Sequence, residues 1–154
     1  MISDTNMIQL LADIPLFNGL DASQLQYLSK VCIPKSYPAG TIIFQENEIA
    51  SIFYIVVTGS IKIFTSNKSG EDKILSICSA GDSFGEVALL DGKSRSATAQ
   101  TLEQTTVLTL SAQNFQKLLM DNFDITLQLI RQLSTRLREM NQQVHDLAYL
   151  DARQ

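Results

Sequence analysis

The stretch "IFYIVVTGSIKIFTSN", residues 52–67, decides the fold that we expect for this chain. β-Branched and aromatic side chains dominate both halves of the stretch, and such residues are typical of strands. Gly59 and Ser60 divide it near its middle, and this pair of residues is a turn signal. The stretch therefore predicts two strands separated by a tight turn.

Further segments of the same composition occur between residues 34 and 110, with turn signals and no long helical pattern between them. They are "TIIFQE" (41–46), "KILSIC" (73–78), "SATAQTL" (96–102) and "TTVLTL" (105–110). Short strands at this close spacing are typical of an antiparallel sandwich or a jelly-roll barrel. We therefore predict a mainly β fold with flanking helices, built as a double-stranded β-helix (jelly-roll) barrel.

Helical patterns flank the predicted strands on both sides. Residues 1–33 look helical, and "DASQLQYLSKVC" begins with Asp21, a good N-cap, followed by Gln24 in a capping-box arrangement. After the strands, Ser111 can cap the segment "AQNFQKLLMDN". We expect an N-terminal helix before the barrel and further helices after it.

A longer helix is expected from Phe123 to Tyr149, with apolar side chains at heptad spacing. These heptad residues are Ile130, Leu133, Leu137, Met140, Val144 and Leu147. A small barrel would have to cover a helix about 40 Å long to bury them all. We therefore favour pairing with a twin helix in a homodimer; the alternative is packing within one subunit. The expected domains are the jelly roll with its flanking helices, residues 1–122, and the long dimerisation helix, residues 123–154.

Composition excludes several classes of protein. The 154 residues suit one domain, and with 45% apolar and 18% charged residues the chain is expected to be globular. A net charge of −4 argues against this segment gripping a nucleic-acid backbone alone. Cys32 and Cys78 lack metal-ligand spacing, so we expect buried free thiols in a reducing cytosol. Because neither a signal peptide nor a run of about 20 apolar residues is evident, we expect a cytoplasmic protein without a membrane partner.

A second stretch, "FGEVALLDGKSRSATA" at residues 84–99, carries the candidate chemistry. The guanidinium of Arg95 can donate parallel hydrogen bonds to phosphate oxygens. The carboxylate of Glu86 would repel a phosphate, but it can accept a hydrogen bond from a sugar hydroxyl. Free N–H groups of a short helical turn after Gly85 would add donors. The stretch predicts a pocket for one phosphate and one sugar hydroxyl; the alternative is that Glu86 and Arg95 merely pair with each other.

The same stretch resembles the phosphate-binding cassette of the cyclic nucleotide-binding domain, with Phe-Gly-Glu at 84–86 and Arg-Ser-Ala at 95–97. Further matches, such as "YPAGTIIFQENE" and "AGDSFGE", extend the resemblance over nearly the whole chain. The resemblance implies that Glu86 accepts the ribose 2′-hydroxyl, that Arg95 binds the cyclic phosphate and that Gly85 holds the ribose edge. The implied ligand-binding residues of the cassette, some acting through backbone amides, are Phe84, Gly85, Glu86, Val87, Ala88, Arg95, Ser96 and Ala97.

The end of the chain resembles a narrower group, the Crp/Fnr family of bacterial transcription regulators. The segment "RQLSTRLREMNQQVHDLAYLD", residues 131–151, looks like their long dimerisation helix up to the hinge. In that family a helix-turn-helix domain follows, and no such DNA-binding domain is present in this sequence. We therefore expect either the sensor fragment of a longer regulator or a stand-alone sensor, with DNA contacted only through a domain outside this chain.

The base of the ligand is the less specific part of this resemblance. In cAMP-responsive members of the family the long helix offers a Thr-Ser pair to the adenine, where this chain has Met140 and Asn141. Asn141 could bond a purine edge and Met140 could pack on its face, while Arg136 and Leu137 match the family and would close the pocket. Ser96 follows the bacterial cAMP-type cassette. We therefore expect cAMP as the ligand, with cGMP as the alternative.

These expectations combine into a ligand-gated dimer that needs no metal or cofactor and is not an enzyme. A jelly-roll enzyme of the cupin type would need a cluster of His and carboxylate ligands, whereas His145 is the single histidine. An iron–sulfur sensor would need about four cysteines. The remaining alternative is a domain that has lost ligand binding and serves only for dimerisation.

Overall fold

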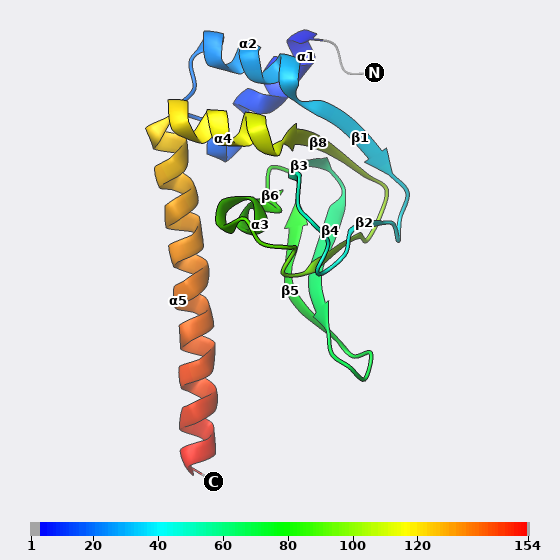
Figure 1. Cartoon of the computed structure of the whole chain (residues 1–154), viewed down its shortest axis with the longest axis vertical. Coiled ribbons are helices and arrows are strands. Elements are labelled where there is room, and N and C mark those ends of the chain that lie inside the picture. The colour runs from blue at the N-terminus through cyan, green and yellow to red at the C-terminus, as the bar shows by residue number, and fades with distance from the viewer. Residues whose placement is uncertain (1–3, 154) are drawn as a thin grey trace. The chain divides into compact units, whose positions relative to one another are not determined.

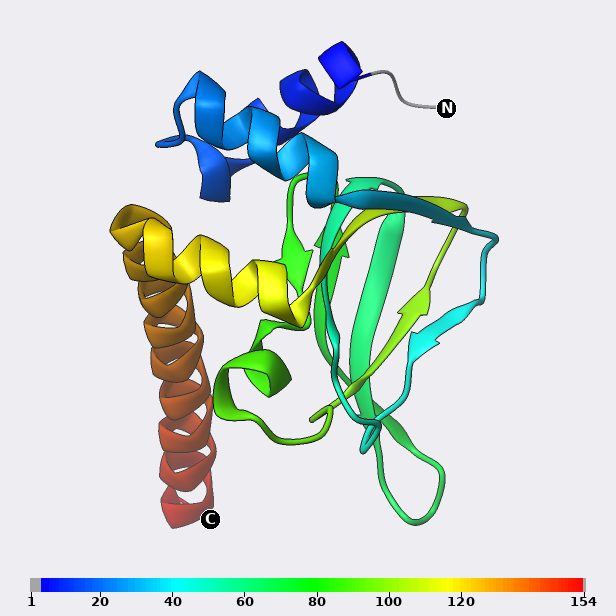
Figure 2. The ribbon, with the colours of Figure 1, turned by 45° about the horizontal axis from the view of Figure 1, so that its top comes forward.

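The computed structural model describes residues 4–153. The chain divides into two compact units, Met1–Lys117 and Leu118–Gln154. Figures 1 and 2 show the strands and short helices of the first unit, and the long helix of the second, which runs from orange to red.

Within residues 4–153, the strands form two four-stranded sheets in which all paired neighbours are antiparallel. One sheet has the order β1-β8-β3-β6, with the strands Ile33–Tyr37, Thr105–Ser111, Ile52–Thr58 and Ser83–Phe84. The other has the order β2-β7-β4-β5, with the strands Ile42–Phe44, Thr98–Thr101, Ser60–Ser66 and Asp72–Ser79. The predicted mainly β fold of the jelly-roll type is thereby confirmed.

The chain passes from one sheet to the other at Gly59, between β3 and β4. Gly59 has a φ of 96°, in the left-handed region that favours glycine. A side chain at this position would also overlap Thr105 Oγ1 and the Gln104 carbonyl. The turn in the middle of the stretch 52–67 therefore requires glycine.

The structure adds β1 and β6 to the predicted strands. β1 contains Pro34 and Lys35, which are uncommon in strands. It lies at the edge of its sheet, where a proline does not interrupt the ladder, and it pairs only with β8. β6 has just two residues, which is too short for any pattern to indicate it.

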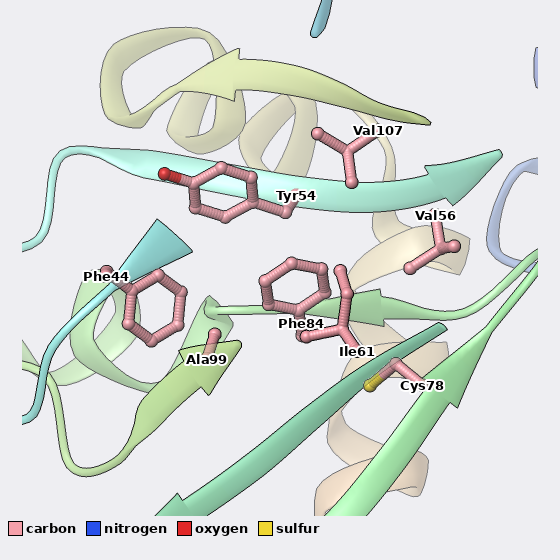
Figure 3. Close-up of a cluster of buried hydrophobic side chains, with 8 residues drawn as sticks. All are labelled: Phe44, Tyr54, Val56, Ile61, Cys78, Phe84, Ala99 and Val107. Carbon is pink, nitrogen blue, oxygen red and sulfur yellow. The ribbon is translucent and has the colours of Figure 1, made fainter. Parts of the chain in front are cut away.

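The core of the first unit contains side chains from both sheets. Figure 3 shows them as sticks, with the rings of Phe44, Tyr54 and Phe84 close to one another. The buried cluster consists of Phe44, Tyr54, Val56, Ile61, Cys78, Phe84, Ala99 and Val107. Burying a large apolar side chain contributes about 1.5–3 kcal/mol, so this cluster holds the two sheets together.

Helices precede and follow the strands, as predicted. Before the strands come α1 (Asp4–Ala12), the 3-10 helix η1 (Pro15–Phe17) and α2 (Ala22–Val31), and after them comes α4 (Ala112–Asp121). One short helix, α3 (Glu86–Asp91), lies between β6 and β7. The capping box before α2 is confirmed: the Gln24 N–H donates to Asp21 Oδ1 over 2.8 Å, and the Asp21 N–H donates to Gln24 Oε1 over 2.9 Å. Ser111 also acts as predicted, because its Oγ accepts from the Asn114 N–H over 3.2 Å.

The second unit consists of the end of α4 and the helix α5, Phe123–Arg153. Thr126 Oγ1 donates to the Leu119 carbonyl over 2.7 Å, and Asn122 Nδ2 donates to the Leu118 carbonyl over 2.9 Å. The first bond joins α5 to α4, and the second ties the junction residue Asn122 to α4. None of the helices within residues 4–153 combines the length and hydropathy that a bilayer span requires.

Candidate ligand site

The candidate site is built around the short helix α3 and the turn before it. Phe84 ends β6 and is buried, and Gly85 follows as the N-cap of α3 with a φ of 88°. A Cβ on Gly85 would stand 2.9 Å from Nη1 of Arg95 and 3.4 Å from the Tyr54 ring. Glycine is therefore required here both by the backbone conformation and by the close approach of Arg95.

The side chain of Arg95 is the centre of the site and is only 4% exposed. Its Nη1 donates to the Gly85 carbonyl over 2.7 Å, and its Nη2 donates to the Ile52 carbonyl over 2.6 Å. Both are short, charge-assisted hydrogen bonds, which are stronger than neutral ones. Because the carbonyls belong to the turn before α3 and to the start of β3, the guanidinium is held between these two elements.

The backbone of Arg95 is held by the loop between β2 and β3. The Arg95 N–H donates to the Glu48 carbonyl over 2.7 Å, and the Asn47 N–H donates to the Arg95 carbonyl over 2.8 Å. Asn47 has a φ of 76°, a conformation that asparagine adopts more readily than most residues. An isolated bridge between Ile49 and Ser94 continues the pairing. The loop thus fixes the point from which the arginine side chain extends.

Aromatic rings surround the guanidinium on the core side. Its Cζ lies 4.0 Å from the centroid of the Phe44 ring and 5.8 Å from that of the Tyr54 ring. Burial lowers the pKa of Arg95, whereas Tyr54, Glu48 and Glu86 raise it by electrostatic attraction. Burial likewise raises the pKa of the Tyr54 hydroxyl. Arginine remains charged in proteins, so the site contains a buried cation.

Glu86 is the first residue of α3 and is only 3% exposed. A carboxylate in the first turn of a helix interacts favourably with the backbone N–H groups there. Its charge also acts on Arg95, because it is one of the groups that raise the arginine pKa. The structure therefore brings the two charged residues of the cassette into one buried site, where a carboxylate acceptor and a guanidinium donor lie together.

The other cassette residues surround these two charges. Ala88 and Ala97 are buried, whereas Val87 and Ser96 are exposed.

The predicted base-contacting residues belong to the second unit. Arg136, Leu137, Met140 and Asn141 all lie on α5, and their side chains are exposed. Leu137 and Met140 are each more than half exposed. Their part in a ligand site stays a prediction.

Several residues that shape the site did not follow from the sequence. Phe44 and the Ile52 carbonyl contact the Arg95 guanidinium, and Glu48 bonds its backbone. These residues lie about 50 positions before Arg95, and periodicity within a segment carries no information about such contacts. A phenylalanine at the end of a strand indicates only a core residue.

The cysteines are buried free thiols, as expected. Burial raises the pKa of Cys32 to about 12, so this thiol is unreactive in the folded chain. Among the described residues, no group of three or more His, Cys, Asp or Glu side chains is arranged to hold a metal ion.

A jelly roll whose buried arginine and glutamate flank a glycine turn defines a class of ligand-binding domains. The family model described as cyclic nucleotide-binding domain matches residues 34–122, which include the whole cassette. This chain belongs to the cyclic nucleotide-binding domain family.

Comparison with individual proteins agrees with this assignment. The chain is 30% identical over 145 residues to the CRP-like cAMP-activated global transcriptional regulator of Mycobacterium tuberculosis, covering 94% of this chain and 65% of that protein. The crystal structure of the Thermus thermophilus catabolite activator protein superposes with a TM-score of 0.78 and 29% identity, over 87% of this chain and 63% of that one. The sensor domain of the transcriptional regulator DNR from Pseudomonas aeruginosa gives a TM-score of 0.80 and 29% identity, over 92% and 95%. The chain thus spans about two thirds of the regulator from M. tuberculosis.

Proposed function

We propose that this chain is a sensor domain that binds cAMP and has no enzymatic activity of its own. The observation that carries the proposal is the buried Arg95, held by carbonyls of two elements and facing the glycine turn of α3. An arginine has more N–H donors than these bonds use, and we assign the others to the cyclic phosphate. A cationic side chain buried beside a carboxylate suits a ligand that carries one anionic group and neighbouring hydroxyls.

The remaining cassette residues complete the phosphate–ribose site. Glu86 accepts the ribose 2′-hydroxyl, and Gly85 lets the ribose edge approach the backbone. The first-turn amides of α3, near Ala88, and the amides of Ser96 and Ala97 donate to the phosphate. Phe84 and Val87 line the site on either side of the Gly-Glu pair.

The relatives favour cAMP over cGMP. The M. tuberculosis regulator is named as cAMP-activated, and the cassette of this chain carries Ser96. We assign the base contacts to Arg136, Leu137, Met140 and Asn141 of α5. Because Met140 and Asn141 differ from the pair usual in cAMP-responsive members, cGMP is the alternative ligand.

We further propose that α5 forms the dimer and transmits the signal. Every side chain from Ser134 to Leu150 is exposed in the single chain, including Leu137, Val144 and Leu147 of the heptad. Exposed apolar residues at heptad spacing are typical of a helix that pairs with another. Ligand binding shifts the dimer only if it favours one helix arrangement over another. In this proposal residues 1–122 sense the nucleotide, and residues 123–154 carry the response to a DNA-binding domain or partner in the cytoplasm.

Isothermal titration calorimetry of ligand-free protein with cAMP, and with cGMP in parallel, tests the proposal. We expect saturable binding of cAMP that Arg95→Ala weakens about 100-fold or more, because it removes charged hydrogen bonds to the phosphate. The control is Arg131→Ala, which removes an exposed arginine of α5 outside the proposed site. A preference for cGMP would keep the site and overturn the choice of base. Unchanged affinity in Arg95→Ala would refute the site.

The second candidate function is a dimerisation module that binds no nucleotide. The exposed heptad of α5 favours it, since this surface needs a partner whether or not a ligand binds. Folded, nucleotide-free protein that sediments as a dimer and binds neither nucleotide would establish this function instead.

A further inference from the structure

We propose that Phe44 is a positioning residue for Arg95, the arginine assigned to the phosphate. The ring of Phe44 keeps the plane of the Arg95 guanidinium in the orientation in which it binds the ligand. The inference rests on the proposed function, and it adds to the site a residue outside the cassette. It predicts that the affinity for a cyclic nucleotide depends on the electron density of an aromatic ring that itself need not touch the ligand.

The contact has the geometry of a cation–π interaction. The Arg95 Cζ lies 4.0 Å from the centroid of the Phe44 ring, well within the range over which such contacts are attractive. Phe44 is only 7% exposed and Arg95 only 4%, so water does not separate the cation from the ring. Desolvated contacts of this kind are the stronger ones.

The two side-chain hydrogen bonds of Arg95 leave one rotation of the guanidinium unrestrained, and the Phe44 ring restrains it. Nη1 bonds the Gly85 carbonyl and Nη2 bonds the Ile52 carbonyl, so the outer edge of the guanidinium is fixed at these two nitrogens. The plane can still rock about the line that joins them. A ring beneath the plane fixes its tilt, and with it the direction of the remaining N–H donors.

Phe44 can act as a platform because its own ring is held. The centroid of the Phe44 ring lies 5.7 Å from that of Tyr54 and 6.0 Å from that of Phe84, and the Tyr54 and Phe84 rings stack on each other 5.0 Å apart. Figure 3 shows these three side chains coming together from β2, β3 and β6. A ring that is held in place by its neighbours can fix the position of the guanidinium packed against it.

Replacing Phe44 by phenylalanines with increasing numbers of ring fluorines tests the proposal most directly. Fluorine withdraws the charge from the ring face while nearly keeping its shape, so a purely structural role would leave affinity unchanged. We expect the affinity for cAMP to fall stepwise with fluorination, and to fall about threefold to tenfold in Phe44→Leu, which removes the ring. The matched control is Phe64, equally exposed at 7%, whose ring lies beneath Lys62 instead, with 4.6 Å between Nζ and the centroid.

A ligand-free measurement separates this inference from the proposed function. The Arg95 side-chain protons, assigned by their loss in Arg95→Lys, should be shifted upfield by the Phe44 ring current, and Phe44→Leu should remove that shift. Stepwise loss of affinity at position 44, without loss at position 64, supports the inference. Equal losses at both positions, or none at position 44, overturn it. Wild-type protein that binds neither cyclic nucleotide refutes the proposed function, and the ring-current shift then decides whether Phe44 holds Arg95.

Discussion

Gly85→Ala tests whether the turn before α3 controls the position of Arg95. Gly85 has a φ of 88°, and a residue with a side chain in this region costs about 1–2 kcal/mol. The new Cβ would also stand 2.9 Å from Arg95 Nη1, which must then move away from the Gly85 carbonyl that it now bonds at 2.7 Å. A charged hydrogen bond contributes about 1.5–3 kcal/mol. We therefore expect the free energy of unfolding to fall by about 2.5–5 kcal/mol, and the affinity for cAMP to fall about tenfold or more.

Gly92→Ala separates the cost of the backbone conformation from the effect of displacing Arg95. Gly92 caps the other end of α3 with a φ of 72°, but no atom of the described residues lies within 4 Å of the position that a Cβ would take there. This variant should lose about 1–2 kcal/mol of stability for the backbone conformation alone and keep its affinity. Urea unfolding followed by circular dichroism measures the first quantity, and calorimetry with cAMP measures the second. If Gly85→Ala and Gly92→Ala bind cAMP equally well, the turn at Gly85 does not control the position of Arg95.

Other predictions follow from the same structure. Asn47→Val should cost about 1–2 kcal/mol in urea unfolding because of the positive φ, whereas Asn47→Gly should cost little; equal losses would contradict the role given to this turn. The folded chain keeps the Cys32 thiol neutral up to a pKa of about 12. The contribution of the neutral Cys32 thiol to the free energy of unfolding is therefore complete below about pH 9 and is lost as the pH rises toward 12. Cys32→Ala should reduce this fall in the free energy of unfolding, measured by urea unfolding, by up to about 1.4 kcal/mol per pH unit. Val144→Glu should shift the dimer to monomer in sedimentation experiments without changing the circular dichroism spectrum, because Val144 is exposed in the single chain; an unchanged dimer would exclude this seam.

Local chemistry made the frame of the fold predictable. Strand composition located six of the strands, β2, β3, β4, β5, β7 and β8. The capping residues Asp21 and Ser111 marked helix starts. Each of these patterns depends on near neighbours in the sequence. β1 escaped prediction since its partner β8, not its own composition, makes it a strand. The candidate site was predictable only in part for the same reason. The cassette was visible in the sequence, whereas the contacts of Arg95 with Phe44 and with the Ile52 carbonyl arise only when distant strands meet.

The burial of Arg95 and Glu86 itself argues for a ligand. Removing an ion from water costs several kcal/mol, and the attraction within a buried pair often does no more than offset that cost. Apolar side chains of similar volume would stabilise the roll at least as well, since the site adjoins the cluster of Phe44, Tyr54 and Phe84. In the proposed function this arrangement has a use: a cation held by two carbonyls and an aromatic face, beside a carboxylate acceptor, would be ready to bind a phosphate and a sugar hydroxyl before the ligand arrives, at some cost in stability.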